Sequence, residues 1–262
     1  MGSKVYFMSD LHLGAHYIAD HRAHERRVVG FLDSIAGDAA ELYLLGDILD
    51  YWYEYRTVVP RGHVRFFAAL ARLADSGVRI YWMTGNHDVW LFDYLRDEIG
   101  LTVLKGHTVA TIMGCRFFLS HGDDVGRRPA MYRFMRWCFY NRVCQALYAA
   151  IHPRWTYQIA AGWSADNRTS RTPQSELAGA EASARSLLEF SEDYNGRGGG
   201  IAHFVYGHLH IARQQSLAAG GDVTFLGDWI TKSTYAVFDG AELRLCSFGS
   251  ESTASAPKSG IK

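Results

Sequence analysis

Short runs of β-branched and aromatic residues alternate with longer stretches in which apolar residues recur every three or four positions. In the first part of the chain this pattern predicts strands at 4–8, 42–45 and 78–83, and helices at 24–35, 64–74 and 90–99. Strands that alternate with amphipathic helices are typical of layered α/β proteins. The pattern therefore predicts an α/β architecture.

After Gly100 the strand pattern becomes denser. Consecutive strands are predicted at 101–104, 108–112 and 116–119, with Gly114 as the turn between the last two. Later in the chain a helix is predicted at 175–189 and a glycine-rich hinge at 196–200, followed by strands at 201–206, 223–226, 234–238 and 242–248. The α/β part thus continues into a β-rich part.

Between these two parts the composition changes to aromatic residues mixed with arginine. Residues 131–151 have the length and periodicity of one long helix. We expect residues 127–172 to form an inserted helical cap, and residues 1–126 and 173–249 to form one catalytic domain. The end of the chain, 250–262, is rich in Ser, Ala, Lys and Gly, which predicts a disordered tail.

Composition and charge exclude several classes of protein. With 262 residues, 48% of them hydrophobic, the chain is long enough for one large domain with a substantial core. Lys plus Arg equals Asp plus Glu at 27 each, which gives no reason to expect a nucleic-acid partner. The four cysteines fit no zinc or redox spacing and no apolar leader precedes the first strand, so we expect reduced thiols in the cytoplasm.

Side chains with metal-binding chemistry follow five of the predicted strands, at the point where each strand ends. In chain order they are Asp10 and His12, then Asp47, then Asn86, His87 and Asp88, then His121, and finally His208 and His210. Open α/β sheets bind ligands at the carboxyl ends of their strands, so we expect these side chains to meet. Asp50, on the turn after Asp47, could support a ligand or cap a helix, and the roles of Asp123, Asp124 and Asp228 stay open.

The residue types in this set indicate which metals and which reaction to expect. Carboxylate, imidazole and one amide oxygen suit manganese, iron or zinc and match calcium poorly. The set is large enough for two ions, and paired ions promote hydrolysis of phosphoesters and phosphoanhydrides. A lone Asp-x-His or Gly-His-x-His arises by chance in many chains, and such residues then serve as core histidines or helix caps. Five such segments together favour a two-metal hydrolase.

The same segments, in the same order, resemble the signature of the calcineurin-like metallophosphoesterases: Asp10-Leu-His12, Gly46-Asp47, Gly85-Asn-His-Asp88, His121 and Gly207-His-Leu-His210. The resemblance implies a four-layer α/β/β/α sandwich. It also implies that Asp10, His12 and His210 bind one ion, that Asn86, His121 and His208 bind another, and that Asp47 bridges them. The position of His87 in such enzymes contacts the phosphate and helps to protonate the leaving group. Asp88 would orient His87 or hold its loop.

Within this superfamily the chain is similar to the UDP-2,3-diacylglucosamine diphosphatases of lipid A synthesis. Three features carry the similarity: the start Ser9-Asp-Leu-His-Leu13, the helical insertion after His121-Gly-Asp123, and Leu226-Gly-Asp-Trp229. Well-known members of that group carry Arg where this chain has His87. The similarity implies a glycolipid-nucleotide substrate, two divalent ions, foremost manganese, and release of UMP. The oligomeric state is left open.

The predicted cap and the segment after it supply the candidate substrate contacts. The cap combines large apolar residues with arginines. The apolar residues are Met131, Phe134, Met135, Trp137, Phe139, Tyr140, Leu147, Tyr148 and Ile151, and the arginines are Arg127, Arg128, Arg133, Arg136 and Arg142. Such a helix can line an acyl groove and lie at the inner membrane surface as a peripheral element, or it can simply pack on the catalytic domain. The segment Asn167-Arg168-Thr-Ser170-Arg171 resembles the sugar and diphosphate contacts of the lipid A enzymes, although an ordinary solvated loop would read the same way.

Two other functions compete with the lipid A reaction. The first is a phosphoesterase for a soluble ester such as a cyclic nucleotide, a sugar phosphate or a phosphoprotein, for which an open polar cleft is expected. The second is a binding module without catalysis, like the retromer subunit of the same fold. Because all seven expected ligand positions hold suitable residues, the sequence argues against the binding module.

Overall fold

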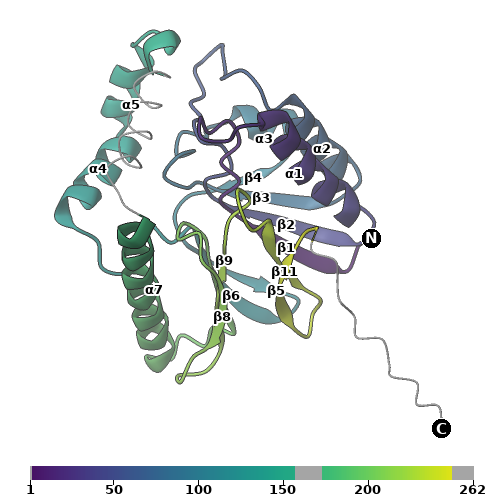
Figure 1. The fold of residues 1–262 in the computed structure, drawn as a ribbon, viewed down its shortest axis with the longest axis vertical. Helices are drawn as coiled ribbons and strands as arrows, with labels where there is room; N and C mark the ends of the chain where they lie inside the picture. The colour runs from purple at the N-terminus through teal and green to yellow at the C-terminus, as the bar shows by residue number, and fades with distance from the viewer. Residues whose placement is uncertain (1, 157–172, 250–262) are drawn as a thin grey trace.

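Two β-sheets pack face to face and carry helices on their outer surfaces (Figure 1). The structure is a computed structural model that describes residues 2–156 and 173–249. The first sheet has the strand order β11-β10-β1-β2-β3-β4, formed by Leu243–Ser247, Thr234–Phe238, Lys4–Met8, Ala39–Leu45, Arg79–Met83 and Thr102–Leu104. The second has the order β5-β6-β7-β9-β8, formed by Thr108–Ile112, Cys115–Ser120, His203–Tyr206, Asp222–Leu226 and Ala212–Ser216.

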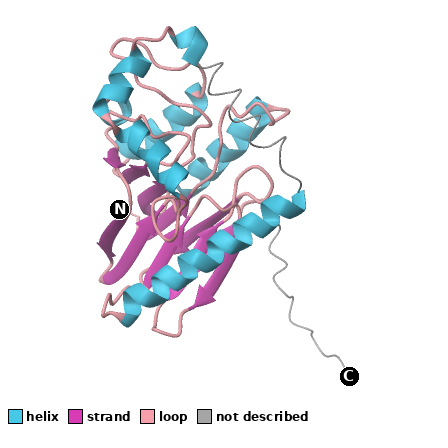
Figure 2. Cartoon of the chain, turned by 90° about the vertical axis from the view of Figure 1, so that its left-hand side faces the viewer, coloured by secondary structure: helices cyan, strands magenta, loops and turns pink. Residues whose placement is uncertain are grey.

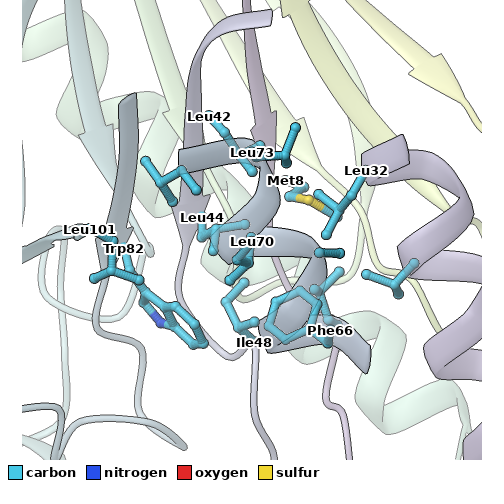
Figure 3. Close-up of a cluster of buried hydrophobic side chains, with 14 of the residues drawn as sticks. Met8, Leu32, Leu42, Leu44, Ile48, Phe66, Leu70, Leu73, Trp82 and Leu101 are labelled. Atoms are coloured by element: carbon cyan, nitrogen blue, oxygen red, sulfur yellow. The ribbon is translucent and has the colours of Figure 1, made fainter. Parts of the chain in front are cut away.

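Helices cover the outer face of each sheet. Next to the first sheet lie α1 (His21–Ile35), α2 (Val64–Asp75) and α3 (Tyr94–Ile99) (Figure 1). Their apolar faces meet the sheet in a cluster that includes Leu32 of α1, Leu70 of α2 and Trp82 of β3 (Figure 3). The long helix α7 (Pro173–Gly196) crosses the strands of the second sheet (Figure 2). It buries Ala184 and Leu187 against that sheet.

The alternation of side chains along each strand builds the layers. In β1, Val5 and Phe7 face the second sheet, whereas Tyr6 and Met8 face the helices. In β6, Phe118 instead contributes to the cluster beneath α7. Each such side chain contributes roughly 1.5–3 kcal/mol when fully buried. Both faces of both sheets are therefore apolar, and the predicted four-layer α/β/β/α sandwich is confirmed.

Strand direction places the candidate ligands at one edge of the sandwich. Strands β1, β2, β3 and β4 run parallel, as do β6, β7 and β9. The carboxyl ends of parallel strands share one edge of a sheet. The segments that follow β1, β2, β3, β6 and β7 therefore converge, and these are the segments that carry the candidate ligands.

The region predicted as one long helix consists of two. Helix α4 spans Ala130–Tyr140 and α5 spans Arg142–Ala149. Asn141 between them is extended, with φ −75° and ψ 123°, and its side chain accepts hydrogen bonds from the backbone of Val143 and Cys144. A new helix thus begins at an asparagine cap where the periodicity showed no interruption.

Other departures from the expected elements are smaller. The helix expected from residue 90 begins only at Tyr94, and α7 extends through the first residue of the predicted hinge. Strand β8 was missed because it is a largely exposed edge strand of sequence ARQQS, without the apolar alternation of a core strand. The predicted tail at 250–262 and the substrate segment at 167–171 lie outside the described residues. Within the described ranges, no helix combines the length and the apolar character needed to cross a bilayer.

Candidate metal centre

The structure brings the candidate ligands from five strand exits into one cluster. Three overlapping groups have ligand atoms close enough to share an ion: Asp10, His12 and His210; His12, Asp47 and His87; and Asp47, His121 and His208. Asp47 belongs to two of these groups. The first and third groups correspond to the two ion sites that the sequence predicted, apart from Asn86.

Distances place Asp47 between the two sites. Its Oδ2 atom lies 3.8 Å from His12 Nε2 and 3.3 Å from His121 Nε2. On the first side, His210 Nε2 lies 3.3 Å from Asp10 Oδ1 and 3.3 Å from His12 Nε2. On the second side, Asn86 Oδ1 lies 3.3 Å from His121 Nε2, so the asparagine also reaches the cluster. A carboxylate between two groups of ligands suits a bridging role.

Five of the candidate ligands have a strained backbone. Values of φ between 45° and 68° occur at Asp10, His12, Asp47, His208 and His210. Non-glycine residues in the left-handed region cost of order 1–3 kcal/mol each and gather at functional sites. Here the conformation is held by hydrogen bonds between the loops, from His208 N to Asp10 Oδ2 at 2.9 Å and from His12 N to the carbonyl of Asp47 at 2.9 Å. The fold thus holds strained turns in place to aim these side chains.

The imidazole nitrogens face the centre in the form that a metal requires. His12 Nδ1 lies 3.2 Å from Asp50 Oδ1, and His121 Nδ1 lies 2.8 Å from the carbonyl oxygen of Leu45. When Nδ1 donates to such an oxygen, Nε2 carries the lone pair that binds a metal. Asp10 Oδ1 is buried and accepts no hydrogen bond from the described residues, which leaves an acceptor oriented for a cation. The donor set therefore fits divalent ions.

Burial and neighbouring charges shift the pKa values of the candidate ligands in different directions. Burial lowers the pKa of His208 to about 3, and the neighbouring His121 acts in the same direction, so this ring is neutral. Burial would raise the pKa of Asp47, but His121, His87 and His12 outweigh it and hold the pKa well below its usual value. The carboxylates act oppositely on two other rings: Asp47 raises the pKa of His121 and Asp10 raises that of His210, against the effect of burial. Metal binding at these two rings would therefore release their protons.

His87 lies at the open edge of the cluster. Its side chain is 26% exposed and that of His210 is 30% exposed, whereas His12, Asp10 and His121 are buried. His87 Nδ1 lies 2.9 Å from the carbonyl oxygen of Asp50, and its backbone amide donates to Asp47 Oδ1. The ring therefore stands beside the ligands with Nδ1 already engaged. Its role in proton transfer stays a prediction.

Asp88 has contacts of a different kind. Its carboxylate is fully buried and accepts hydrogen bonds from the backbone amides of Gly85, Asp47 and Ile48 and from Trp82 Nε1. Burial, with help from the charge of Asp47, raises the pKa of Asp88 to about 6. These bonds join the turns after β2 and β3. Of the two roles predicted for Asp88, the contacts favour holding the loop over orienting His87.

Two residues beside the cluster contact the candidate ligands, and sequence reasoning missed one of them. Asp50, which the sequence left either to support a ligand or to cap a helix, pairs with His12. Lys232 was not singled out, yet its ammonium group donates to the carbonyl of His210 at 2.8 Å and to Asp228 Oδ2 at 2.7 Å. The motif Leu226-Gly-Asp-Trp229 could have indicated that this region supports the cluster, because the backbone amide of Trp229 donates to the carbonyl of Asp10.

The helices α4 and α5 lie beside this centre with a mixed surface. Phe139 and Tyr148 pack against Trp90 of the catalytic part, with ring centroids 5.4 and 4.6 Å apart. On the other side Met131, Phe134 and Trp137 are 69%, 59% and 58% exposed. Packing on the catalytic part thus accounts for some of the aromatic residues and leaves others uncovered by the described residues.

Comparison with known proteins agrees with the site. The chain is 39% identical to the UDP-2,3-diacylglucosamine hydrolase of Porphyromonas gingivalis over 259 residues, which cover 94% of this chain and 97% of that protein. It is 33% identical to the enzyme of the same name from Ralstonia nicotianae over 229 residues, which cover 86% and 83%. Residues 3–212 match the calcineurin-like phosphoesterases. With its candidate ligand residues gathered at the strand ends, this chain belongs to the calcineurin-like phosphoesterase family and is a metal-dependent hydrolase.

Proposed function

We propose that this protein hydrolyses the pyrophosphate of UDP-2,3-diacylglucosamine to UMP and 2,3-diacylglucosamine 1-phosphate. The observation that carries the proposal is the gathering of seven candidate ligands, Asp47 among them, into one cluster, in a chain that aligns over nearly its whole length with a hydrolase of that name. We assign Asp10, His12 and His210 to one ion, Asn86, His121 and His208 to the other, and Asp47 to both.

Different residues of the chain have different roles in the proposed hydrolysis. Bound divalent ions, for which we propose manganese, supply activation of water and neutralise charge on the phosphate. Asp50 orients the ring of His12, and Lys232 holds the backbone of His210. We assign to His87, at the open edge of the cluster, contact with a phosphate and delivery of a proton to the leaving oxygen.

The remaining assignments concern the lipid part of the substrate. We propose that the exposed apolar residues of α4 and α5 receive the acyl chains at the cytoplasmic face of the inner membrane. Apolar side chains that are more than half exposed on one helix commonly mark a lipid or partner surface. We also propose that Asn167, Arg168, Ser170 and Arg171, outside the described residues, contact the sugar and diphosphate.

The decisive experiment compares two substrates with the purified, manganese-loaded protein in detergent. UMP release from UDP-2,3-diacylglucosamine is measured alongside hydrolysis of bis(p-nitrophenyl) phosphate, a soluble diester. We expect metal-dependent UMP release with the lipid substrate to be the faster reaction. Turnover of the soluble diester without any UMP would retain the metal centre but refute the lipid substrate, and His87 in place of the arginine of well-known members would then mark a different branch.

A further inference from the structure

A pocket of about 640 Å³ opens beside the metal centre, at the loop that follows His121. It is lined by Asp124, Gly126, Arg127, Arg128, Pro129 and Arg133. Half of the lining residues are thus arginines. Like charges at close range repel one another, and a bound anion would relieve that repulsion.

The positive charge of this pocket is not cancelled by the part of the chain that the structure describes. No ion pair involves Arg127, Arg128 or Arg133 among the described residues. The lining contains a single carboxylate, that of Asp124, and both of its oxygens accept hydrogen bonds from residues outside the lining. Its Oδ1 accepts from Ser120 at 2.6 Å, and its Oδ2 accepts from the backbone amide of His107 at 2.7 Å. The pocket therefore retains a net positive charge.

The wall of the pocket is held in place on both sides. The backbone amide of Arg127 donates to Ser186 Oγ of α7 at 3.0 Å. The guanidinium of Arg128 donates through Nη2 to the carbonyl of Gly122 and lies 6.0 Å from the ring centroid of Tyr132. Its Nε atom is buried without a hydrogen-bond partner among the described residues. Because this atom is buried in the wall, the groups that a ligand can reach most easily are the exposed side chains of Arg127 and Arg133.

We propose that Arg127, Arg128 and Arg133 form a phosphate-binding site separate from the metal ligands. Arginine offers planar pairs of donors that match phosphate oxygens, and several arginines around one hollow suit a phosphate mono- or diester. The phosphate source that we favour is the headgroup of an anionic lipid, because Met131, Phe134 and Trp137 are exposed on the helix that begins at this pocket. A soluble phosphate compound shares the same chemistry.

Vesicle binding tests the lipid source without any need for turnover. The metal-loaded, full-length protein is sedimented with vesicles of phosphatidylcholine alone and of phosphatidylcholine with phosphatidylglycerol. We expect the variant R127Q/R128Q/R133Q to bind the anionic vesicles on the order of 100-fold more weakly than the unaltered protein, since each basic residue near an anionic surface contributes roughly fivefold. The control R22Q/R26Q/R27Q removes the same charge from α1 and should lose much less.

Titration with inorganic phosphate, followed by the shift in melting temperature, tests the soluble source. All variants keep the seven metal ligands, so phosphate bound at the ions contributes equally to each. Loss of the phosphate-induced shift in R127Q/R128Q/R133Q alone, with vesicle binding unchanged, would support the site and assign it a soluble ligand. The Arg128→Lys variant should retain part of the response, which distinguishes lost binding from misfolding. If the pocket variant and the α1 control behave alike in both measurements, the proposal is wrong.

Discussion

At the scale of single residues, the carboxylate of Asp47 lies between the two candidate ion sites, and we expect ion binding at both sites to depend on it. The Asp47→Ala variant should lose activity by more than about 100-fold, the upper end of the cost of altering a residue that only supports a ligand. It should also lose one or both ions, as measured by elemental analysis. Asp33→Ala, which removes an exposed partner of Arg72, is the control and should leave both unchanged. Full activity of Asp47→Ala would refute the two-metal assignment.

Asp88 shows how a single residue can serve the site through stability. Replacing it by Ala removes the acceptor of three buried backbone amides and of Trp82 Nε1. Each unsatisfied donor costs about 1–3 kcal/mol, so we expect the free energy of unfolding to fall by at least about 3 kcal/mol. Urea unfolding measures this, with Asp193→Ala on the surface of α7 as the control. Unchanged stability with lost turnover would instead show a catalytic role.

At the scale of elements, α4 is joined to the metal loop by a few polar contacts. Arg136 pairs with the buried carboxylate of Asp123, which also accepts from Tyr132 at 2.9 Å. No residue of α4 is buried, and its C-terminal end is also attached through Phe139, which packs against Trp90, so the Asp123 contacts hold the N-terminal part of the helix. The Arg136→Met variant leaves Asp123 short of a partner, at a cost of about 3 kcal/mol. We expect faster hydrogen exchange across α4 and unchanged exchange in β1 and β2.

The matched control for this helix is Arg133→Met. Arg133 lies on the exposed side of α4 and forms no ion pair among the described residues. Its replacement should leave hydrogen exchange in α4 close to that of the unaltered protein. Equal exchange in the two variants would show that the Asp123–Arg136 pair does not hold the helix.

At the scale of the whole molecule, the ions should stabilise the fold, since the ligand loops come from both sheets. Removal of metal with a chelator leaves the carboxylates and the strained turns without their cation. For an ion present at 1,000 times its Kd the loss is about 4 kcal/mol. In a protein of this size that corresponds to a fall in Tm of about 10 °C. Scanning calorimetry should show this fall, and added manganese should reverse it.

The Asp47→Ala variant serves as the control for this measurement. With its bridging carboxylate removed, it should respond to the chelator much less than the unaltered protein does. An equal response in both proteins would show that the stabilising ion is bound elsewhere.

The ligand residues were predictable because their signals are local. Asp10 and His12 stand two positions apart directly after a buried strand, and so do His208 and His210. Both the spacing and the preceding strand can be recognised in the sequence. Asp50 and Lys232 gave no such signal. Their roles depend on which ring or carbonyl the fold brings within hydrogen-bond reach. The break at Asn141 was likewise hidden, because an asparagine within an amphipathic stretch fits either a helix interior or a cap.

The sequence by itself predicted a layered α/β architecture and a set of candidate metal ligands. The first follows from periodicity and the second from residue chemistry, which act over a few neighbouring positions, whereas the four-layer arrangement was implied by the family resemblance. Only the tertiary structure decided that Asp47 lies between the two ligand groups and that Asp88 joins two loops. It also decided that Arg127, Arg128 and Arg133 line one hollow without a neutralising partner among the described residues. Such relations depend on distances between segments far apart in the chain, and those distances are set by the packing of the sheets.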